Sequence, residues 1–365
     1  MEKNITCKLG FGCMRLPVNR DGKIDCVLAE KMIDYAYENG INYFDTAWPY
    51  HDGESEIFIG EALKKYPRES FWLADKMPMS NIEKKEEVQE IFEKQLEKCQ
   101  VEYFDNYLCH ALNKDNWQKV LDFKVLDYLK EQKKLGKIKH LGFSFHDSRD
   151  VLKTILDRED WDFVQLQLNY YDVANGDAQQ LIDLAAEHNV PIFVMEPIRG
   201  GFLARCVPDA ITEIENAYGK NTAPALRLCY AFNIKGVKVV LSGMSTMEQV
   251  VENVATAKNP IPMDEKAEKV IKDVMDDINS FVTVPCTKCR YCMPCPAGLD
   301  IPEIFRIYND WCLFKNSRRT LGEIEKLEKK PADCVNCKKC MRVCPQRLEI
   351  PEIMKKIAAE LSEIK

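Results

Sequence analysis

The sequence predicts an α/β protein in which a (β/α)8 TIM barrel precedes a small, cysteine-rich domain. From residue 9 to about residue 258, short apolar runs alternate with amphipathic stretches, a pattern typical of parallel strands joined by helices. Eight such runs in about 250 residues match the size of a barrel of this type. Behind them, eight of the sixteen cysteines lie in two tight groups after residue 285. For the front part, a doubly wound open sheet is the alternative.

The strands are expected at short runs rich in branched and aromatic residues. In chain order they are KLGFG (8–12), NYFDTA (42–47), FWLADK (71–76), FDNYLCH (104–110), IKHLGFSF (138–145), FVQLQLN (163–169), PIFVMEP (191–197) and VKVVLSG (237–243). Between most of them apolar residues recur at helical spacing, as in residues 26–40 and 88–99, so a helix is expected after each strand.

Two prolines, Pro260 and Pro262, end this alternation. We therefore predict a barrel over residues 1–262, a charged linking helix over 263–283 and a small domain over 284–365. The small domain contains a repeat, because CPAGLDIPEIFRIYN (295–309) matches CPQRLEIPEIMKKIA (344–358) in frame. The polar stretch between the two copies, KNSRRTLGEIEKLEKKPAD, is expected to be an exposed helix or loop whose charges are solvated.

Composition excludes several classes of function. Hydrophobic residues make up 46% and charged residues 30% of the chain, which is ordinary for a globular protein. The net charge of −7 argues against a nucleic-acid partner. No apolar run approaches the roughly 20 residues of a membrane span. Cysteines concentrated in two groups indicate metal ligation in a reducing compartment, and we expect a cytoplasmic protein.

The two cysteine groups have the spacing of iron–sulfur ligands. They comprise Cys286, Cys289, Cys292 and Cys295 before Pro296, and Cys334, Cys337, Cys340 and Cys344 before Pro345. The second group fits C-x2-C-x2-C-x3-C-P. In the first group two residues instead of three precede the last cysteine, so Cys295 departs from the pattern. Zinc is the alternative, but its tetrahedral sites use two separated cysteine pairs.

From Cys286 to Ile350 the chain resembles a two-cluster, bacterial-type ferredoxin domain. The resemblance implies two [4Fe-4S] clusters with crossed ligands. One set would be Cys286, Cys289, Cys292 and Cys344, and the other Cys334, Cys337, Cys340 and Cys295. Cys312, between the two groups, is expected to be a buried thiol.

Four polar residues lie at or just past the carboxyl ends of predicted strands two to four: Asp45, Tyr50, Lys76 and His110. In a barrel these ends meet on the face that carries the catalytic loops. Taken singly, each has an ordinary structural explanation, such as a cap, a surface ring, a solvated charge or a packed histidine. Together they suit carbonyl reduction, in which a proton donor must serve the oxygen that gains charge. An ammonium lowers the pKa of a nearby tyrosine, a carboxylate holds the ammonium, and an imidazole hydrogen-bonds the carbonyl.

Residues 8–258 resemble the aldo-keto reductase superfamily, through GFGCMRLP (10–17), FDTAWPYHDGESEIFIGEAL, LADK, YLCH and LSGMSTMEQVVENV. The resemblance implies an NAD(P)H cofactor lying across the carboxyl face of the barrel. By position, Ser144 and Gln165 would contact the nicotinamide carboxamide. The adenosine and phosphates would be bound by Ser242, Gly243, Met244, Gln249 and Asn253.

The chain departs from the family pattern in two places. Met244 and Gln249 stand where NADPH-preferring members place basic residues, so the choice between NADH and NADPH stays open. Glu196 stands where many members stack an aromatic ring on the nicotinamide. Its carboxylate either faces the nicotinamide or its ribose, or forms a salt bridge with Arg199.

The whole chain resembles the branch of aldo-keto reductases that carries a C-terminal 4Fe-4S domain. Three functions are compatible with it. The first is a carbonyl reductase or alcohol dehydrogenase acting on a small molecule, with clusters of structural or electron-transfer role. The second is a redox adaptor with a partner ferredoxin or flavoprotein, and the third is an iron–sulfur sensor with a binding-only barrel. We favour the first, because the four catalytic residue types are all present.

Overall fold

The computed structural model describes residues 4–201, 203, 208–219, 222–281, 284–314 and 317–363. Its contacts divide the chain into two compact units, Met1–Pro197 with Ala225–Met263, and Ile198–Pro224 with Asp264–Lys365. The sequence placed residues 198–224 with the barrel. They group with the second unit because helix α9 (Pro208–Tyr218) packs along α12 (Glu265–Phe281), where the Lys266 Nζ donates a hydrogen bond to the Ala217 carbonyl.

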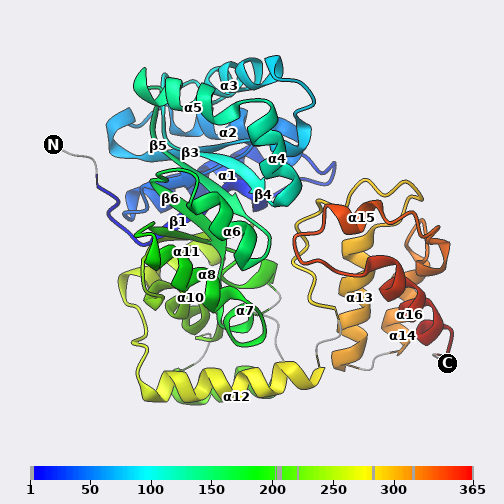
Figure 1. The fold of residues 1–365 in the computed structure, drawn as a ribbon. Helices are drawn as coiled ribbons and strands as arrows, with labels where there is room; N and C mark the ends of the chain where they lie inside the picture. The colour runs from blue at the N-terminus through cyan, green and yellow to red at the C-terminus, as the bar shows by residue number, and fades with distance from the viewer. Residues whose placement is uncertain are drawn as a thin grey trace. The chain divides into compact units, whose positions relative to one another are not determined.

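The first unit is a closed barrel of eight parallel strands in sequence order, as predicted, and the open-sheet alternative is wrong (Figure 1). The strands are β1 (Leu9–Gly12), β2 (Tyr43–Asp45), β3 (Trp72–Met77), β4 (Phe104–Leu112), β5 (Ile138–Phe145), β6 (Phe163–Gln167), β7 (Ile192–Met195) and β8 (Val237–Gly243). The barrel closes where β1 pairs with β8, with Gly12 opposite Gly243. All eight lie within or beside the predicted runs.

Amphipathic helices cover the barrel. They are α1 (Cys26–Glu38), α2 (Glu54–Leu63), α3 (Glu86–Cys99), α4 (Lys114–Asp122), α5 (Val125–Lys134), α6 (Arg149–Leu156), α7 (Tyr170–Asn175), α8 (Ala178–Glu187), α10 (Ala223–Asn233) and α11 (Met247–Lys258). Helix α1 is an example of such an amphipathic helix. The Asp25 side chain caps its first turn, and Met32 and Ile33 are fully buried.

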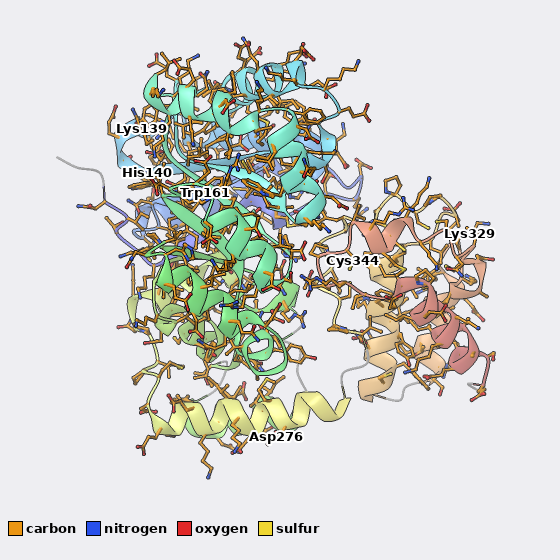
Figure 2. All side chains as sticks on the ribbon, viewed as in Figure 1. Lys139, His140, Trp161, Asp276, Lys329 and Cys344 are labelled. Carbon is orange, nitrogen blue, oxygen red and sulfur yellow. The ribbon has the colours of Figure 1, made fainter. Side chains whose placement is uncertain are left out.

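The barrel is filled, so its chemistry is confined to its mouth. Seven residues from the strands form an interior cluster: Tyr43, Ala74, Leu108, Phe163, Phe193, Val239 and Leu241. Figure 2 labels His140 at the start of β5. Its ring stacks on that of Trp72 with centroids 5.2 Å apart. This packing leaves the carboxyl ends of the strands as the face on which side chains can converge.

The second unit is helical and contains the repeat. Besides α9 and α12 it has α13 (Ile301–Phe314), α14 (Ser317–Glu325), α15 (Lys339–Arg342) and α16 (Ile350–Glu363). Helices α13 and α16 are the two copies of the repeat, and each begins with Ile-Pro, where proline's missing N–H is tolerated. Their apolar faces share one core with residues such as Leu299, Phe305 and Met354.

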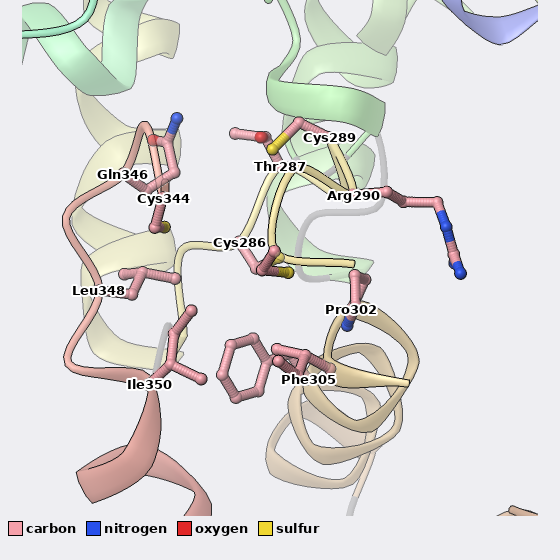
Figure 3. A pocket seen from close by; sticks show the side chains of 12 residues that line it. Cys286, Thr287, Cys289, Arg290, Pro302, Phe305, Cys344, Gln346, Leu348 and Ile350 are labelled. Carbon is pink, nitrogen blue, oxygen red and sulfur yellow. The ribbon is translucent and has the colours of Figure 1, made fainter. Parts of the chain in front are cut away.

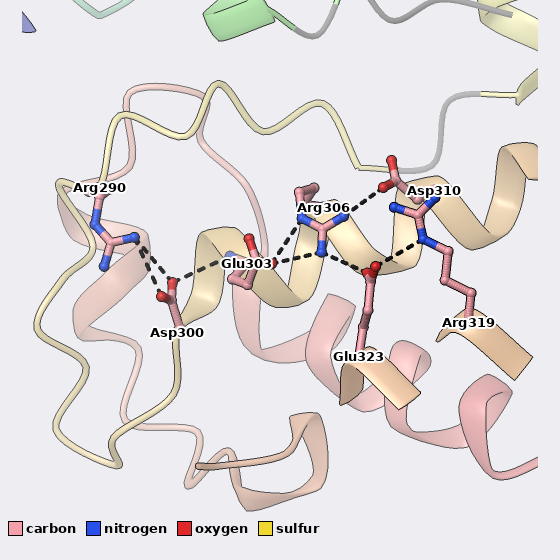
Figure 4. Close-up of polar contacts among 7 residues, drawn as sticks. All are labelled: Arg290, Asp300, Glu303, Arg306, Asp310, Arg319 and Glu323. Atoms are coloured by element: carbon pink, nitrogen blue, oxygen red, sulfur yellow. Dashed lines mark hydrogen bonds and ion pairs between the residues drawn. The ribbon is translucent and has the colours of Figure 1, made fainter. Parts of the chain in front are cut away.

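The charges between the two copies are not merely solvated, which corrects the expectation for this stretch. Glu323 on α14 accepts hydrogen bonds from Arg306 and Arg319, at 2.7 and 2.9 Å (Figure 4). Arg306 on α13 also pairs with Glu303 and Asp310. These two arginines lower the pKa of the Glu323 carboxyl. The network therefore joins α13 to α14.

Within the described ranges, no helix has the length and apolar character needed to cross a membrane.

Candidate active site and cysteine pocket

The four predicted catalytic side chains meet at the barrel mouth. The Lys76 Nζ lies 2.5 Å from the Asp45 Oδ1, 2.6 Å from the Thr46 carbonyl oxygen and 3.3 Å from the Tyr50 Oη. The Tyr50 and His110 rings meet edge to face with centroids 6.0 Å apart. Asp45, Lys76 and His110 come from the carboxyl halves of β2, β3 and β4, so the parallel register brings them together.

Burial sets the electrostatics of this cluster. Lys76 is fully buried, and its only carboxylate partner is Asp45 among the ion pairs of the described residues. Burial first, and then the Asp45 carboxylate, hold the pKa of Tyr50 well above its ordinary value. This differs from the lowered pKa that the sequence led us to expect, because desolvation of the ring outweighs the nearby ammonium. Tyr50 therefore keeps its proton at neutral pH.

The His110 imidazole is neutral at physiological pH. Burial lowers its pKa well below the ordinary value, and the positive charges of Lys76 and His146 lower it further. A neutral imidazole can still donate one N–H hydrogen bond. This suits a group that polarises a carbonyl oxygen without transferring a full proton.

Two residues predicted to contact the nicotinamide adjoin this cluster. The Gln165 Nε2 on β6 donates a hydrogen bond to the Asp45 Oδ2 at 3.1 Å. The Ser144 Oγ on β5 accepts a hydrogen bond from the backbone N–H of Ala111, the residue after His110, at 2.7 Å. Both side chains are buried, and both strands deliver them to the same end of the barrel as Lys76.

The residues predicted to bind the nucleotide lie together near the end of β8, but the side chain of Met244 does not face the same way as the others. The Asn253 Nδ2 donates to the Ser242 Oγ at 3.1 Å. The Gln249 Oε1 accepts from the Ser245 backbone N–H at 2.8 Å. Met244 is fully buried in the hydrophobic core, so its side chain faces the protein interior.

Glu196 forms an ion pair with a residue that the sequence did not single out. Its Oε1 lies 3.0 Å from the Arg15 Nη2. Arg199 donates a hydrogen bond to Gln346, and its salt bridge with Glu196 stays a prediction. Among the described residues, the buried Glu196 Oε2 has no hydrogen-bond partner. Arg15 follows β1, and its stem covers Gly243, where an added Cβ would approach within 2.9 Å of the Arg15 Cδ.

A buried polar network behind Lys76 also escaped sequence reasoning. The Gln95 Nε2 on α3 donates to the Lys76 carbonyl oxygen at 3.0 Å and to the Glu56 Oε1 at 2.8 Å. The Glu56 Oε2 pairs with the Lys98 Nζ at 2.8 Å. Amphipathic periodicity places Gln95 on the buried face of α3 but cannot assign its partners.

In the second unit, a small cavity that is partly open to solvent is lined by Cys286, Cys289, Cys292 and Cys344. Figure 3 shows Cys344 on a segment separate from the one that carries Cys286 and Cys289, with the apolar side chains of Leu348, Ile350 and Phe305 below them. Burial, and then the nearby Cys289, Cys286 and Cys344 thiols, raise the pKa of Cys292. Three cysteines of the first group and the last cysteine of the second group thus share one cavity.

The two cysteine loops repeat one backbone conformation. Lys288 and Arg290 adopt left-handed φ values of 57° and 63°, and Asn336 and Lys338 do so at 52° and 59° in the second copy. In each copy the two residues flank the second cysteine. Such turns direct successive N–H groups inward and form concave anion sites, iron–sulfur sites among them. The Lys288 N–H donates to the Cys286 Sγ at 3.4 Å.

Among the residues that the structure describes, no group of three or more His, Cys, Asp or Glu side chains is arranged to hold a metal ion.

Comparisons with known proteins concern mainly the barrel. A model of the aldo/keto reductase family matches residues 8–272. The chain is 29% identical over 206 residues to a probable aldo-keto reductase 1 of Glycine max, and that match spans 53% of this chain and 57% of the soybean protein. It is 26% identical over 284 residues to the NADH-specific methylglyoxal reductase of Escherichia coli, covering 64% of this chain and 84% of that protein.

Two further similarities extend the match. The L-galactose dehydrogenase of Arabidopsis thaliana is 26% identical over 301 residues, which is 75% of this chain and 92% of that enzyme. The solved structure of aldo-keto reductase AKR11C1 from Bacillus halodurans in its holo form has a TM-score of 0.61 and 27% identity, and the match covers 73% of this chain and 91% of that one.

Proposed function

The chain belongs to the aldo/keto reductase family and is an oxidoreductase, and from this we propose that it interconverts a small-molecule carbonyl and its alcohol in an NAD(P)H-dependent reaction with Tyr50 as proton donor. The observation that carries the proposal is the contact of Lys76 with both Asp45 and Tyr50 in a buried cluster.

The residues divide the chemistry of the carbonyl oxygen among them. The nicotinamide, when bound, supplies the hydride. As charge develops on the oxygen, the neutral His110 ring donates a hydrogen bond to it and Tyr50 gives up its hydroxyl proton. An alkoxide is a stronger base than a phenolate, so this transfer is favourable although the pKa of Tyr50 is raised. The Lys76 ammonium stabilises the phenolate that remains, and Asp45 keeps that ammonium in place.

The mouth of the barrel has side chains suited to a dinucleotide. Gln165 and Ser144 would hold the carboxamide. The Arg15 guanidinium suits a pyrophosphate, for which arginine has the matching donor geometry. The unpartnered Glu196 Oε2 is an acceptor for a ribose hydroxyl. Ser242, Gly243, Gln249 and Asn253 would surround the adenosine end, with Met244 contributing backbone groups.

Replacing Tyr50 by phenylalanine tests the reaction. The Tyr50→Phe variant should reduce test aldehydes at least 100-fold more slowly, the usual scale for loss of a proton donor, while cofactor binding measured by fluorescence stays unchanged. Tyr35→Phe, on the outer helix α1, is the matched control and should behave like the unmodified protein. Full reductase activity in Tyr50→Phe would refute the role of Tyr50.

For the second unit we propose two [4Fe-4S] clusters, one held by Cys286, Cys289, Cys292 and Cys344 and the other by Cys334, Cys337, Cys340 and Cys295. The shared cavity supports the first set of ligands, and the repeated left-handed loops support both sets. No group of three or more His, Cys, Asp or Glu side chains among the described residues converges on a point where a single metal ion could bind. A [4Fe-4S] cluster does not need such a point, because each of its four cysteines binds a different iron and the four have only to line one cavity. Reduced thiolates of this kind suit a cytoplasmic location.

Anaerobic purification with iron and sulfide analysis tests this part. Two clusters predict about eight irons per chain. Adding NADH or NADPH then separates two roles. Clusters whose absorbance stays constant while aldehydes are reduced act as structural supports. Clusters that become reduced act in electron transfer, in which case a ferredoxin or flavoprotein partner is the next object of search. A chain without iron would refute the cluster proposal.

A further inference from the structure

Lys98 connects an outer helix to the loop that carries Tyr50. It lies near the end of α3, and its Nζ makes three contacts. It donates a hydrogen bond to the Gly53 carbonyl oxygen at 3.2 Å, pairs with the Glu56 Oε2 at 2.8 Å and lies 4.0 Å from the centroid of the Trp48 ring. Trp48 and Gly53 lie on either side of Tyr50 in the sequence, so one ammonium holds both ends of the loop.

This loop has a conformation that requires support. His51, Asp52 and Gly53 follow Tyr50 with φ values of 52°, 55° and 90°. Left-handed backbone in residues other than glycine is unfavourable and persists only where the surrounding structure enforces it. His51 and Asp52 both carry a side chain, and the carbonyl that ends this run, that of Gly53, is the one bonded to Lys98.

The other partners of Lys98 are themselves fixed. The Glu56 side chain is fully buried and also accepts from Gln95, which in turn donates to the Lys76 carbonyl oxygen. Helix α2 lies against the end of α3 at Gly60, where an added Cβ would come within 2.7 Å of the Lys98 and Cys99 carbonyl oxygens. The Lys98 backbone therefore has little freedom, and its contacts link the Tyr50 loop to the Lys76 strand.

We propose that Lys98 is a positioning residue for Tyr50, holding the strained Trp48–Gly53 loop so that the Tyr50 hydroxyl stays in contact with Lys76. The inference rests on the proposed role of Tyr50 as proton donor. Lys98 itself lies on the outer layer and contacts neither Lys76 nor Tyr50 directly, so its effect on the reaction passes through the loop.

The test is a double-mutant cycle between Lys98 and Tyr50. Lys98→Met should lower kcat by about 10- to 100-fold, the scale expected for a misplaced catalytic group, with the KM for the cofactor unchanged. Lys98→Arg should restore most of the rate, because arginine can still pair with Glu56 and stack on Trp48. In a Tyr50→Phe background, Lys98→Met should have almost no further effect. Lys94→Met, on an exposed position of the same helix, should leave kcat unchanged.

A second variant keeps the test decisive if Lys98→Met does not fold. Removing Lys98 alone leaves the Glu56 carboxylate buried without its cation, so Glu56→Gln/Lys98→Met removes both charges together. This variant should fold and still show the lowered kcat. An unchanged kcat in the folded variant, or an equal loss in both Tyr50 backgrounds, would overturn the positioning role. An active Tyr50→Phe protein would instead overturn the proposed function, whatever Lys98 does.

Discussion

Lys76 lies closer to Asp45 than to Tyr50, with its Nζ 2.5 Å from the carboxylate oxygen and 3.3 Å from the hydroxyl. Lys76 is fully buried and Asp45 nearly so. The pair therefore contributes to the stability of the fold and, in the proposed reaction, to catalysis, and mutation can separate the two contributions.

We expect Lys76→Met to destabilise the fold by about 3–5 kcal/mol, because it leaves a buried carboxylate without a partner. Asp45→Asn/Lys76→Met removes both charges and should recover most of the free energy of unfolding in urea titrations. It should not recover carbonyl reduction, since the ammonium beside Tyr50 is gone. Recovery of the rate with the stability would contradict the role of Lys76.

The pH dependence should differ between the two directions of the reaction. The pKa of Tyr50 is raised, so its proton is present across the neutral range and is lost only as pH rises through that raised value. Reduction should therefore stay level from about pH 7 to pH 10, the ordinary tyrosine value. Alcohol oxidation needs the phenolate and should still be rising at pH 10. A decline in reduction near pH 8 would contradict this assignment.

His110 should make the free energy of unfolding depend on pH on the acidic side of neutrality. Its pKa is lowered in the folded protein, whereas an unfolded chain binds the proton near pH 6.5. The unfolded state then holds more protons below that pH, so stability should fall as pH decreases from about 6.5. His110→Gln should reduce this slope in unfolding measurements between pH 5 and pH 7. If the slope of stability against pH is the same in His110→Gln, other groups cause it.

Removing Arg15, which forms an ion pair with Glu196 and is the proposed partner of the pyrophosphate, should weaken binding of the dinucleotide. Arg15→Met should raise the Kd of the dinucleotide about tenfold, the effect of losing one charge-assisted contact to phosphate. Titration by fluorescence quenching measures it. Arg20→Met, on an exposed position of the same segment, is the control. Equal affinities of the Arg15 variant and the control would remove Arg15 from the cofactor site.

Cys344 is the residue that distinguishes crossed from uncrossed cluster ligands. Because it lines the cavity of Cys286, Cys289 and Cys292, Cys344→Ser should impair the cluster of the first group and leave that of Cys334, Cys337 and Cys340. Iron should fall from about eight to about four per chain. Cys312→Ser, a buried cysteine between the groups, should retain all the iron. Loss of the second group's cluster instead would show uncrossed ligands.

The sequence was informative where local pattern and topology agree. All eight strands follow runs that combine apolar residues with flanking breaks, and a parallel barrel places their carboxyl ends on one face whatever the loops do. The sequence alone therefore predicts that Asp45, Lys76 and His110 lie close together. The repeat behind α13 and α16 was visible because its two copies share the Ile-Pro start and the preceding Cys-Pro.

What the sequence could not supply depends on long-range contacts. Lys98 is one of many lysines on amphipathic helices, and only the close approach of α2 and α3 brings it to Gly53. Glu196 pairs with Arg15, from the opposite end of the barrel sequence, and residue order does not indicate that contact. The raised pKa of Tyr50 also follows from burial, which residue order does not reveal.

The cavity in the second unit is enclosed by two segments that are distant in sequence. Cys286, Cys289 and Cys292 lie on one, and Cys344, Leu348 and Ile350 lie on the other. Its enclosure is therefore a non-local contact, whose formation costs loop-closure entropy. Local unfolding of the segment that carries Cys344 would open the cavity while the first three cysteines keep the turns of their own loop.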